Sequence, residues 1–232
     1  MKIIALISTY QEADNMLNSA IDSASMLDKI FVFDGTTKGM KNTLDWSRPR
    51  LTPNKTTYMN YSGYWKSDAD KRSEMLEEAK AWDEDAWAIW IDGDEILLYG
   101  QYLKDHCYRA DQETATGGTT IRIVEYDGSV AQCYGKLIKV GAVRKYVMSS
   151  YEIELSNGMT VAMPNVPICS AGGIPVGEIT SKDDPLLALN RPPVIGEPHL
   201  LHRHGLRSPS REAPRLHDEE AKDFDQLVKE GN

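Results

Sequence analysis

Two aspartates separated by one glycine, Asp92 and Asp94, directly follow the apolar run of residues 86–91. A turn that brings two carboxylates together is costly unless a cation or a proton compensates their charge. A divalent metal ion is the natural compensation, and a third acid, Glu95, adjoins the pair. An Asp-Gly dipeptide alone is a common turn signal, but its place after the most apolar run favours metal binding. An EF-hand is disfavoured, because residues 92–98 lack spaced loop ligands.

Three continuous apolar runs predict the strands that position these acids. They span residues 3–8, 30–33 and 86–91, and runs without polar alternation are typical of strands covered on both faces. Between the first two runs, apolar residues recur at three- and four-residue spacing and predict a helix. A second helix is predicted over about residues 68–82. This order indicates an α/β fold with central parallel strands.

Polar residues follow each of these predicted strands. They are Ser8 to Glu12 after the first, Asp34 to Thr37 after the second, and residues 92–95 after the third. In open α/β sheets, ligands bind beyond the carboxyl ends of the strands. We therefore expect the three strand ends to form one acidic, hydroxyl-bearing cleft.

The second half of the chain has a different pattern of apolar and turn-forming residues. From Gly117 to about Val166, short β-rich runs alternate with turn signals and predict antiparallel structure. Residues 167–198 hold many prolines and glycines and predict a long irregular connection that could cover a site. Residues 218–229 predict a final helix. No internal repeat is found, and 232 residues fit a single domain.

Charge and cysteine content restrict the class of protein. A net charge of −9 argues against a surface that binds nucleic acid along its whole length. Three cysteines, Cys107, Cys133 and Cys169, are far apart and predict neither a zinc site nor a disulfide framework. No apolar stretch approaches membrane-spanning length. We therefore expect a cytoplasmic protein with reduced thiols and no membrane contact.

Three segments within residues 1–100 carry a resemblance to a known family: IIALISTYQEADNMLNSAI, IFVFDGTT and WAIWIDGDEIL. They are similar to the opening strand and turn, the Asp-Gly-Ser/Thr strand end and the D-x-D strand of the small inverting glycosyltransferases with a GT-A fold, which include compact versions from bacteria and phages. Gln11 stands where Asn is usual in the family. The resemblance implies an α/β, GT-A (Rossmann-like) mixed sheet flanked by helices, with an antiparallel acceptor-side portion and C-terminal helices. It also implies one glycosyltransferase domain over residues 1–232, in which residues 1–100 bind the nucleotide sugar and residues 117–232 form the acceptor side and a C-terminal closing segment.

The resemblance also implies roles for single residues. Thr9, Glu12 and Asp34 would line a nucleoside pocket, and Arg72 would face the diphosphate. Asp92 would contact the ribose or the metal, and Asp94 would ligate the metal that bridges the two phosphates. The implied cofactor is Mn²⁺ or Mg²⁺ and the implied donor is a UDP-sugar, whose leaving group needs its negative charge neutralised. For Arg72, an ordinary solvated helix face is an equally good interpretation.

Four of the five histidines lie between His199 and His217. In an extended segment, His202 and His204 face the same way. The resemblance implies that one of the two completes the metal site, and an imidazole ligand suits manganese better than magnesium. The alternative is an exposed or phosphate-contacting histidine pair.

Three arginines, Arg207, Arg211 and Arg215, recur every four residues and would form one basic stripe on a helix. We expect Arg207 or Arg211 to contact phosphate, either of the donor or of the acceptor, with pairing to the acidic tail as the alternative. Protein, glycan and lipid-linked acceptors stay open. A hydroxymethylated base in DNA is a further acceptor that the arginine stripe would suit.

An inverting transfer needs a carboxylate that accepts the proton of the acceptor hydroxyl. The candidates are Glu152, Glu154, Asp127 and Glu125. The stretch GKLIKVGAVRKYVMSSYEIEL resembles the family segment that ends in a His-Glu pair and places Glu152 first, although Tyr151 replaces the histidine. The alternative is that Glu152 and Glu154 lie on the solvent-exposed face of a strand.

Two other functions compete with sugar transfer. A sugar-nucleotide nucleotidyltransferase could share the sheet and the acidic turn, but no Gly-rich, Lys/Arg-bearing loop follows the first strand to hold a triphosphate. A catalytically silent sugar- or nucleotide-binding module is the second alternative. The intact Asp34, Asp92 and Asp94 and the histidine cluster count against it.

Overall fold

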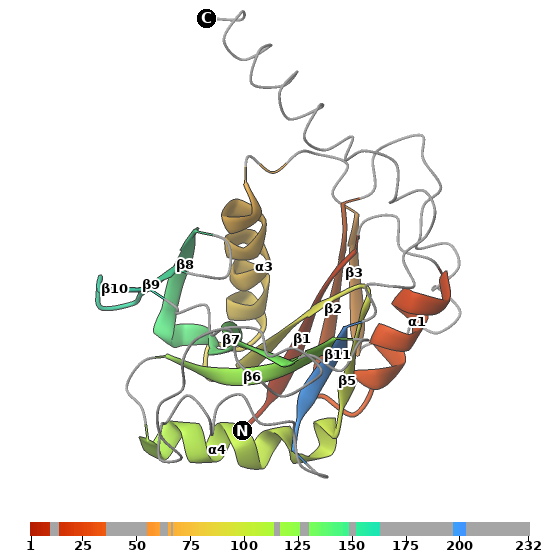
Figure 1. Ribbon diagram of the computed structural model, residues 1–232. Coiled ribbons are helices and arrows are strands. Elements are labelled where there is room, and N and C mark those ends of the chain that lie inside the picture. The colour runs from red at the N-terminus through yellow and green to blue at the C-terminus, as the bar shows by residue number, and fades with distance from the viewer. Residues whose placement is uncertain are drawn as a thin grey trace, which may run out of the picture.

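The structure is a computed structural model that describes residues 1–9, 14–35, 55–60, 65, 67–113, 117–125, 130–148, 152–162 and 197–202. Within these residues, eight strands form one mixed sheet in the order β3-β2-β1-β4-β7-β6-β11-β5 (Figure 1). Their bounds are β1 Ile3–Thr9, β2 Lys29–Asp34, β3 Thr56–Asn60, β4 Trp87–Asp92, β5 Glu95–Leu98, β6 Gly118–Glu125, β7 Val130–Lys139 and β11 His199–His202.

The sheet changes from parallel to antiparallel pairing beside β4. Strands β3, β2, β1 and β4 are mutually parallel neighbours. β7 then pairs antiparallel with both β4 and β6. β11 lies parallel to β6 and antiparallel to β5. The parallel part therefore ends all its strands at one edge, where the polar residues of the site follow.

Helices cover both faces of the sheet. They are α1 (Asp14–Ser23), α3 (Asp68–Trp82) and α4 (Leu103–Glu113). Every residue of β1 is buried, and alternate side chains point to opposite faces. Ile3, Ala5 and Ile7 pack in one cluster with residues of α1 and α4. Ile4 and Leu6 pack in a second cluster with residues of α3. Figure 1 shows α1 and α3 on opposite sides of the sheet.

Local signals account for α3. The side chain of Ser67 caps its first turn by accepting a hydrogen bond from the backbone N–H of Asp70 at 3.1 Å. Met75, Leu76 and Ala79 form its buried stripe. The helix starts at the edge where the parallel strands end, so its N-terminal turns stand beside the site.

A second, three-stranded antiparallel sheet has the order β10-β9-β8. Its strands are β8 (Val143–Met148), β9 (Glu152–Leu155) and β10 (Thr160–Ala162), and a short 3₁₀ turn, η3 (Val140–Ala142), links β7 to β8. β8 packs on α3, where the Ser73 hydroxyl accepts a hydrogen bond from the backbone N–H of Tyr146 at 2.9 Å. A further 3₁₀ turn, η2 (Gly100–Tyr102), leads into α4.

The α/β class predicted from the sequence, a mixed sheet flanked by helices with an antiparallel second portion, is confirmed. The final helix and most of the connection predicted over residues 167–198 lie outside the described residues. The assignment of the whole chain to one domain, with a donor-binding half at residues 1–100 and an acceptor side at residues 117–232, stays a prediction. In the described part of the chain, no helix has the length and apolar character that crossing a membrane requires. Burial raises the pKa of the Cys107 thiol, as suits a core residue.

The packing of α3 on the sheet leads to the first prediction. Leu76 is fully buried, so we expect Leu76→Ala to lower the free energy of unfolding by about 2–5 kcal/mol, because it leaves a cavity. Urea denaturation measures this loss. The matched control is Glu77→Ala on the same helix, where the side chain is 65% exposed and a change within about 0.5 kcal/mol is expected. Equal losses in the two variants would contradict this packing.

Candidate functional site

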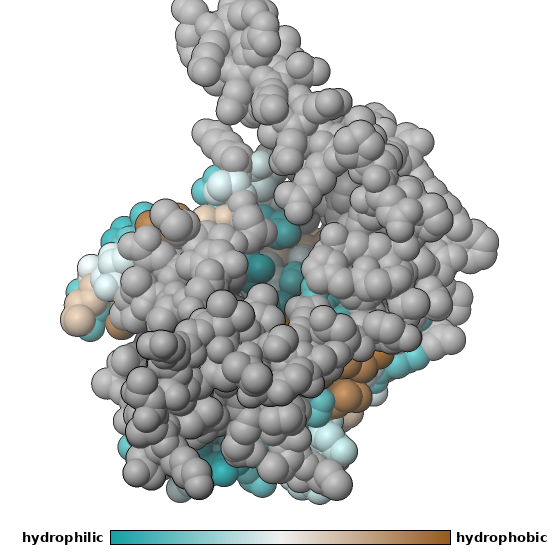
Figure 2. Space-filling model, in the orientation of Figure 1, coloured by the Kyte–Doolittle hydropathy of each residue, from teal (hydrophilic) through white to brown (hydrophobic). Residues whose placement is uncertain are grey.

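The carboxyl ends of β1, β2 and β4 bring three predicted site residues to one edge of the sheet. Thr9 is the register partner of Asp34, and Ser8 is the partner of Asp92. Asp34 is fully buried and accepts a hydrogen bond at 2.7 Å from the hydroxyl of Tyr58 on β3. Figure 2, in the same orientation, shows hydrophilic residues near the centre of this face, beside the positions of α3 and the strand ends in Figure 1.

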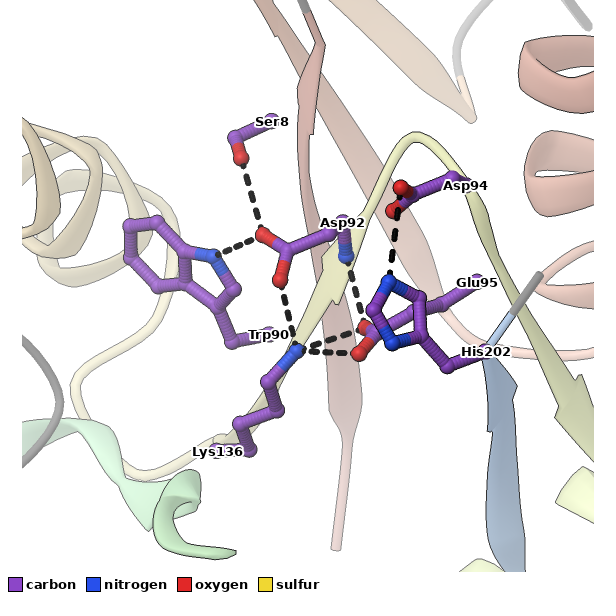
Figure 3. A network of polar contacts seen from close by, with 7 residues as sticks. All are labelled: Ser8, Trp90, Asp92, Asp94, Glu95, Lys136 and His202. Atoms are coloured by element: carbon purple, nitrogen blue, oxygen red, sulfur yellow. Dashed lines mark hydrogen bonds and ion pairs between the residues drawn. The ribbon is translucent and has the colours of Figure 1, made fainter. Parts of the chain in front are cut away.

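The carboxylate of Asp92 is held from three sides (Figure 3). Its Oδ1 atom accepts hydrogen bonds from the Ser8 hydroxyl at 3.2 Å and from the Trp90 indole N–H at 3.3 Å. Its Oδ2 atom lies 2.8 Å from the Lys136 ammonium. The side chain nevertheless stays 36% exposed. Asp92 is thus oriented by the protein and still reachable from outside.

Lys136, on β7, also contacts Glu95. Its Nζ atom lies 2.6 Å from each carboxylate oxygen of Glu95, and Glu95 Oε2 accepts the backbone N–H of Asp92 at 2.8 Å. Both side chains are buried. Burial raises the pKa of Glu95 to about 7, against the attraction of the Lys136 charge. Glu95 therefore holds the turn in place through the backbone N–H of Asp92, and Lys136 compensates the negative charge of Glu95.

Asp94 and His202 meet at the same turn. The imidazole Nε2 of His202 lies 3.4 Å from Asp94 Oδ2, with side chains 13% and 4% exposed. β11 makes this contact possible because it pairs with β5 in a register that sets His202 opposite Glu95. Two side chains far apart in sequence, both of types that ligate metals, are thereby brought together (Figure 3).

Arg72 is buried against the site rather than solvated on a helix face. Its guanidinium carbon lies 4.0 Å from the centre of the Trp90 ring, a cation–π arrangement. The solvated interpretation of Arg72 is therefore wrong. Burial opposes the ionisation of Asp92, but the positive charges of Lys136 and Arg72 outweigh it and hold the pKa of that carboxyl well below its usual range.

The metal-ligand set predicted from the sequence is described only in part. Asp94 and His202 form a pair, while Asp92 is engaged with Lys136. Among the described residues, no group of three or more His, Cys, Asp or Glu side chains could hold a metal ion. His204 lies outside them, as do Glu12, Arg207 and Arg211.

The candidate general bases fall in different parts of the fold. Glu152 begins β9 of the second sheet, and its side chain is outside the described part. Glu154 contacts Arg144 and Lys145 at 2.6 and 3.3 Å; although desolvation opposes it, these two cations lower its pKa. Glu125 ends β6, and its backbone is the register partner of His202. Asp127 lies outside the described residues.

Sequence reasoning missed Lys136 and Tyr58. Lys136 lies two residues before the buried Ile138 on β7 and therefore shares its face of the sheet, and a lysine on a buried face needs a counter-charge. That shared face was the available signal. Tyr58 lies on a short edge strand whose residues are only partly buried, so its pattern indicated little.

The buried ion pair leads to the second prediction. Lys136→Met leaves the Glu95 carboxylate without its cation, and we expect a loss of about 3–5 kcal/mol in the free energy of unfolding near pH 8. Folded Glu95 holds its proton more tightly than the unfolded chain does, because its pKa is raised from 4.5 to about 7. Loss of the Lys136 charge raises the pKa of Glu95 further, so the penalty grows as the pH rises above about 7 and shrinks near pH 5, where Glu95 is protonated in both folded proteins.

Chemical denaturation of Lys136→Met at both pH values checks the sign of this effect. The control is Glu95→Gln/Lys136→Met, which removes both charges and is expected to recover most of the loss at pH 8. A Lys136→Met protein as stable as the parent at pH 8 would contradict the buried pair.

Comparisons with known proteins find only distant structural similarity to this chain. No family model matches the sequence and no curated protein matches it. Among solved structures, S. aureus TarS is 16% identical over 55% of this chain and 22% of TarS, with a TM-score of 0.39. TarS 1-349 in complex with UDP-GlcNAc is 16% identical over 54% of this chain and 34% of that one, with a TM-score of 0.35.

A third solved structure, a 4-diphosphocytidyl-2C-methyl-D-erythritol synthase, is 14% identical over 91% of this chain and 95% of that one, with a TM-score of 0.38. This chain spans about a fifth of the length of TarS. All three TM-scores are low, and a shared fold does not by itself carry a shared activity. The site of this chain must therefore be interpreted from its own residues.

Proposed function

We propose that this protein is a metal-dependent glycosyltransferase of the GT-A type, which moves a sugar from a UDP-linked donor to an acceptor hydroxyl with inversion. The observation that carries the proposal is the meeting of Asp94 and His202 at the edge where β1, β2 and β4 end. Ligands of open α/β sheets bind at this edge. Each of the three sequence segments that resemble the family begins on one of these strands.

The residues at this edge suit a divalent cation. Asp94 offers a carboxylate oxygen and His202 an imidazole nitrogen, a donor pair that manganese accepts. Two protein ligands are enough for a site completed by substrate phosphates and water. When bound, the cation would neutralise the charge that develops on the diphosphate leaving group.

Protein groups around the cation would hold the donor. Thr9 and Asp34, adjacent at the strand ends, would line the nucleoside pocket, and Glu12 would join them. Arg72, fixed on the Trp90 ring, would attract the diphosphate. Arg207 or Arg211 would close over the phosphates from the C-terminal segment.

The transfer itself requires one base. The acceptor oxygen bonds to the anomeric carbon, the bond from that carbon to the diphosphate oxygen breaks, and its electron pair leaves with UDP. A carboxylate takes the proton of the acceptor hydroxyl. Glu125 is the first candidate, because its backbone lies beside His202. Glu152, which the family resemblance favours, is the alternative.

The charge pattern supports a phosphate-bearing acceptor, one of the acceptor classes that the sequence leaves open. Arg207, Arg211 and Arg215 recur every four residues and would suit a phosphate-bearing acceptor, and a hydroxymethylated base in DNA combines a phosphate backbone with a free hydroxyl. A net charge of −9 limits such contact to a small basic rim.

The third prediction concerns the donor site. We expect UDP to bind at least about tenfold more tightly with Mn²⁺ than with a chelator, because Asp94 and His202 would hold the cation and its charge would attract the diphosphate. Isothermal titration calorimetry measures both affinities. Asp94→Asn should remove the metal dependence, while Asp22→Asn on the exposed face of α1 should leave it intact. Equal UDP affinity with and without metal would remove the cation from this site, and tighter binding of GDP would change the nucleotide.

The fourth prediction separates the two candidate bases. Glu125→Gln should lower turnover by about 10²–10⁴-fold, because proton transfer contributes that much, while UDP affinity stays unchanged. Glu152→Gln is the matched comparison and should keep near-parental turnover. Donor consumption with pooled acceptors, followed by mass spectrometry, measures both. The opposite pattern would assign the base to Glu152.

A further inference from the structure

Asp92 has little acceptor capacity left for a metal ion. A carboxylate offers about four acceptor positions. Three are taken by the Ser8 hydroxyl, the Trp90 indole N–H and the Lys136 ammonium. A cation bound through Oδ2 would also lie against the ammonium, where like charges repel. One position remains, on a carboxylate that is 36% exposed, and a neutral hydroxyl can occupy it.

Lys136 cannot swing away to make room. Its side chain is 6% exposed, and both oxygens of Glu95 lie 2.6 Å from its Nζ atom. Glu95 is itself 2% exposed and also accepts the backbone N–H of Asp92. Moving the ammonium would leave a buried carboxylate without its partner, which is strongly unfavourable.

Asp94 stands in a different environment. Its carboxylate faces the imidazole of His202 across the turn, on the side away from Lys136 (Figure 3). Both groups of this pair are ordinary metal ligands. The two aspartates of the turn, one glycine apart, therefore differ in their surroundings: the Lys136 ammonium lies beside Asp92, and the His202 imidazole lies beside Asp94.

We infer that Lys136 is a positioning residue that keeps Asp92 out of the coordination shell of the cation. Asp94 and His202 bind the cation, and Asp92 accepts a hydrogen bond from a hydroxyl of the donor. This inference rests on the proposed function. It adds the residue that gives Asp92 and Asp94 different roles.

A mutant cycle tests the inference through Mn²⁺ affinity alone, read from the electron paramagnetic resonance signal of the free ion. The change Asp92→Asn is made in the parent and in Glu95→Gln/Lys136→Met. The double variant loses one positive and one negative charge, so its net charge equals that of the parent. The general electrostatic effect of losing Asp92 is then nearly the same in both backgrounds, and the difference reports coordination.

In the parent, we expect Asp92→Asn to weaken Mn²⁺ binding by no more than about threefold. In the double variant, where Asp92 is free to ligate, the same change should weaken it at least about tenfold. Lys136→Arg, which keeps a cation beside Asp92, should behave as the parent does. Should the double variant melt below the assay temperature, Glu95→Gln/Lys136→Gln replaces it.

Equal effects of Asp92→Asn in both backgrounds would overturn the role of Lys136 and leave the proposed function standing, provided the parent binds Mn²⁺ and UDP. A tenfold or larger loss in the parent itself would place Asp92 on the metal and also overturn it. A parent protein that binds neither Mn²⁺ nor UDP would overturn the proposed function and this inference together.

Discussion

The buried ion pair between Lys136 and Glu95 is the interaction on which the acidic turn depends. Asp92, Asp94 and Glu95 place three carboxylates within four residues, and such a cluster repels itself unless a cation lies among them. The ammonium comes from β7, the strand at which parallel pairing gives way to antiparallel pairing. The junction of the two halves of the sheet is thus also the place where the charge of the turn is compensated.

Elements whose signals are local were predictable from the sequence. The runs that became β1, β2 and β4 are apolar without alternation because helices cover both faces of the sheet. α3 occupies Asp68–Trp82, the range expected from its acidic start and apolar stripe. The meeting of Thr9, Asp34 and Asp92 follows from parallel pairing, since strands that run the same way end at the same edge.

The other elements and site residues depend on contacts with segments far away in the sequence, which no local sequence pattern indicates. β11 has only four residues, and its place between β6 and β5 is determined by strands far away in sequence. α4 shows a narrow stripe of Leu103, Cys107 and Ala110, too short to stand out. The role of Lys136 depends on carboxylates at the end of β4 and the start of β5, so its type and position alone could not reveal that role.

The dependence on β11 makes the site a long-range assembly. β5 stands at the edge of the sheet, and within the described residues its neighbour in the sheet is β11. The arm of the turn that carries Glu95 is therefore held by main-chain pairing to the strand that carries His202. If β11 left the sheet, the histidine would leave Asp94 and β5 would lose its strand partner in the same step. The arrangement of the acidic turn and the position of His202 beside Asp94 are consequently one cooperative unit rather than two independent features.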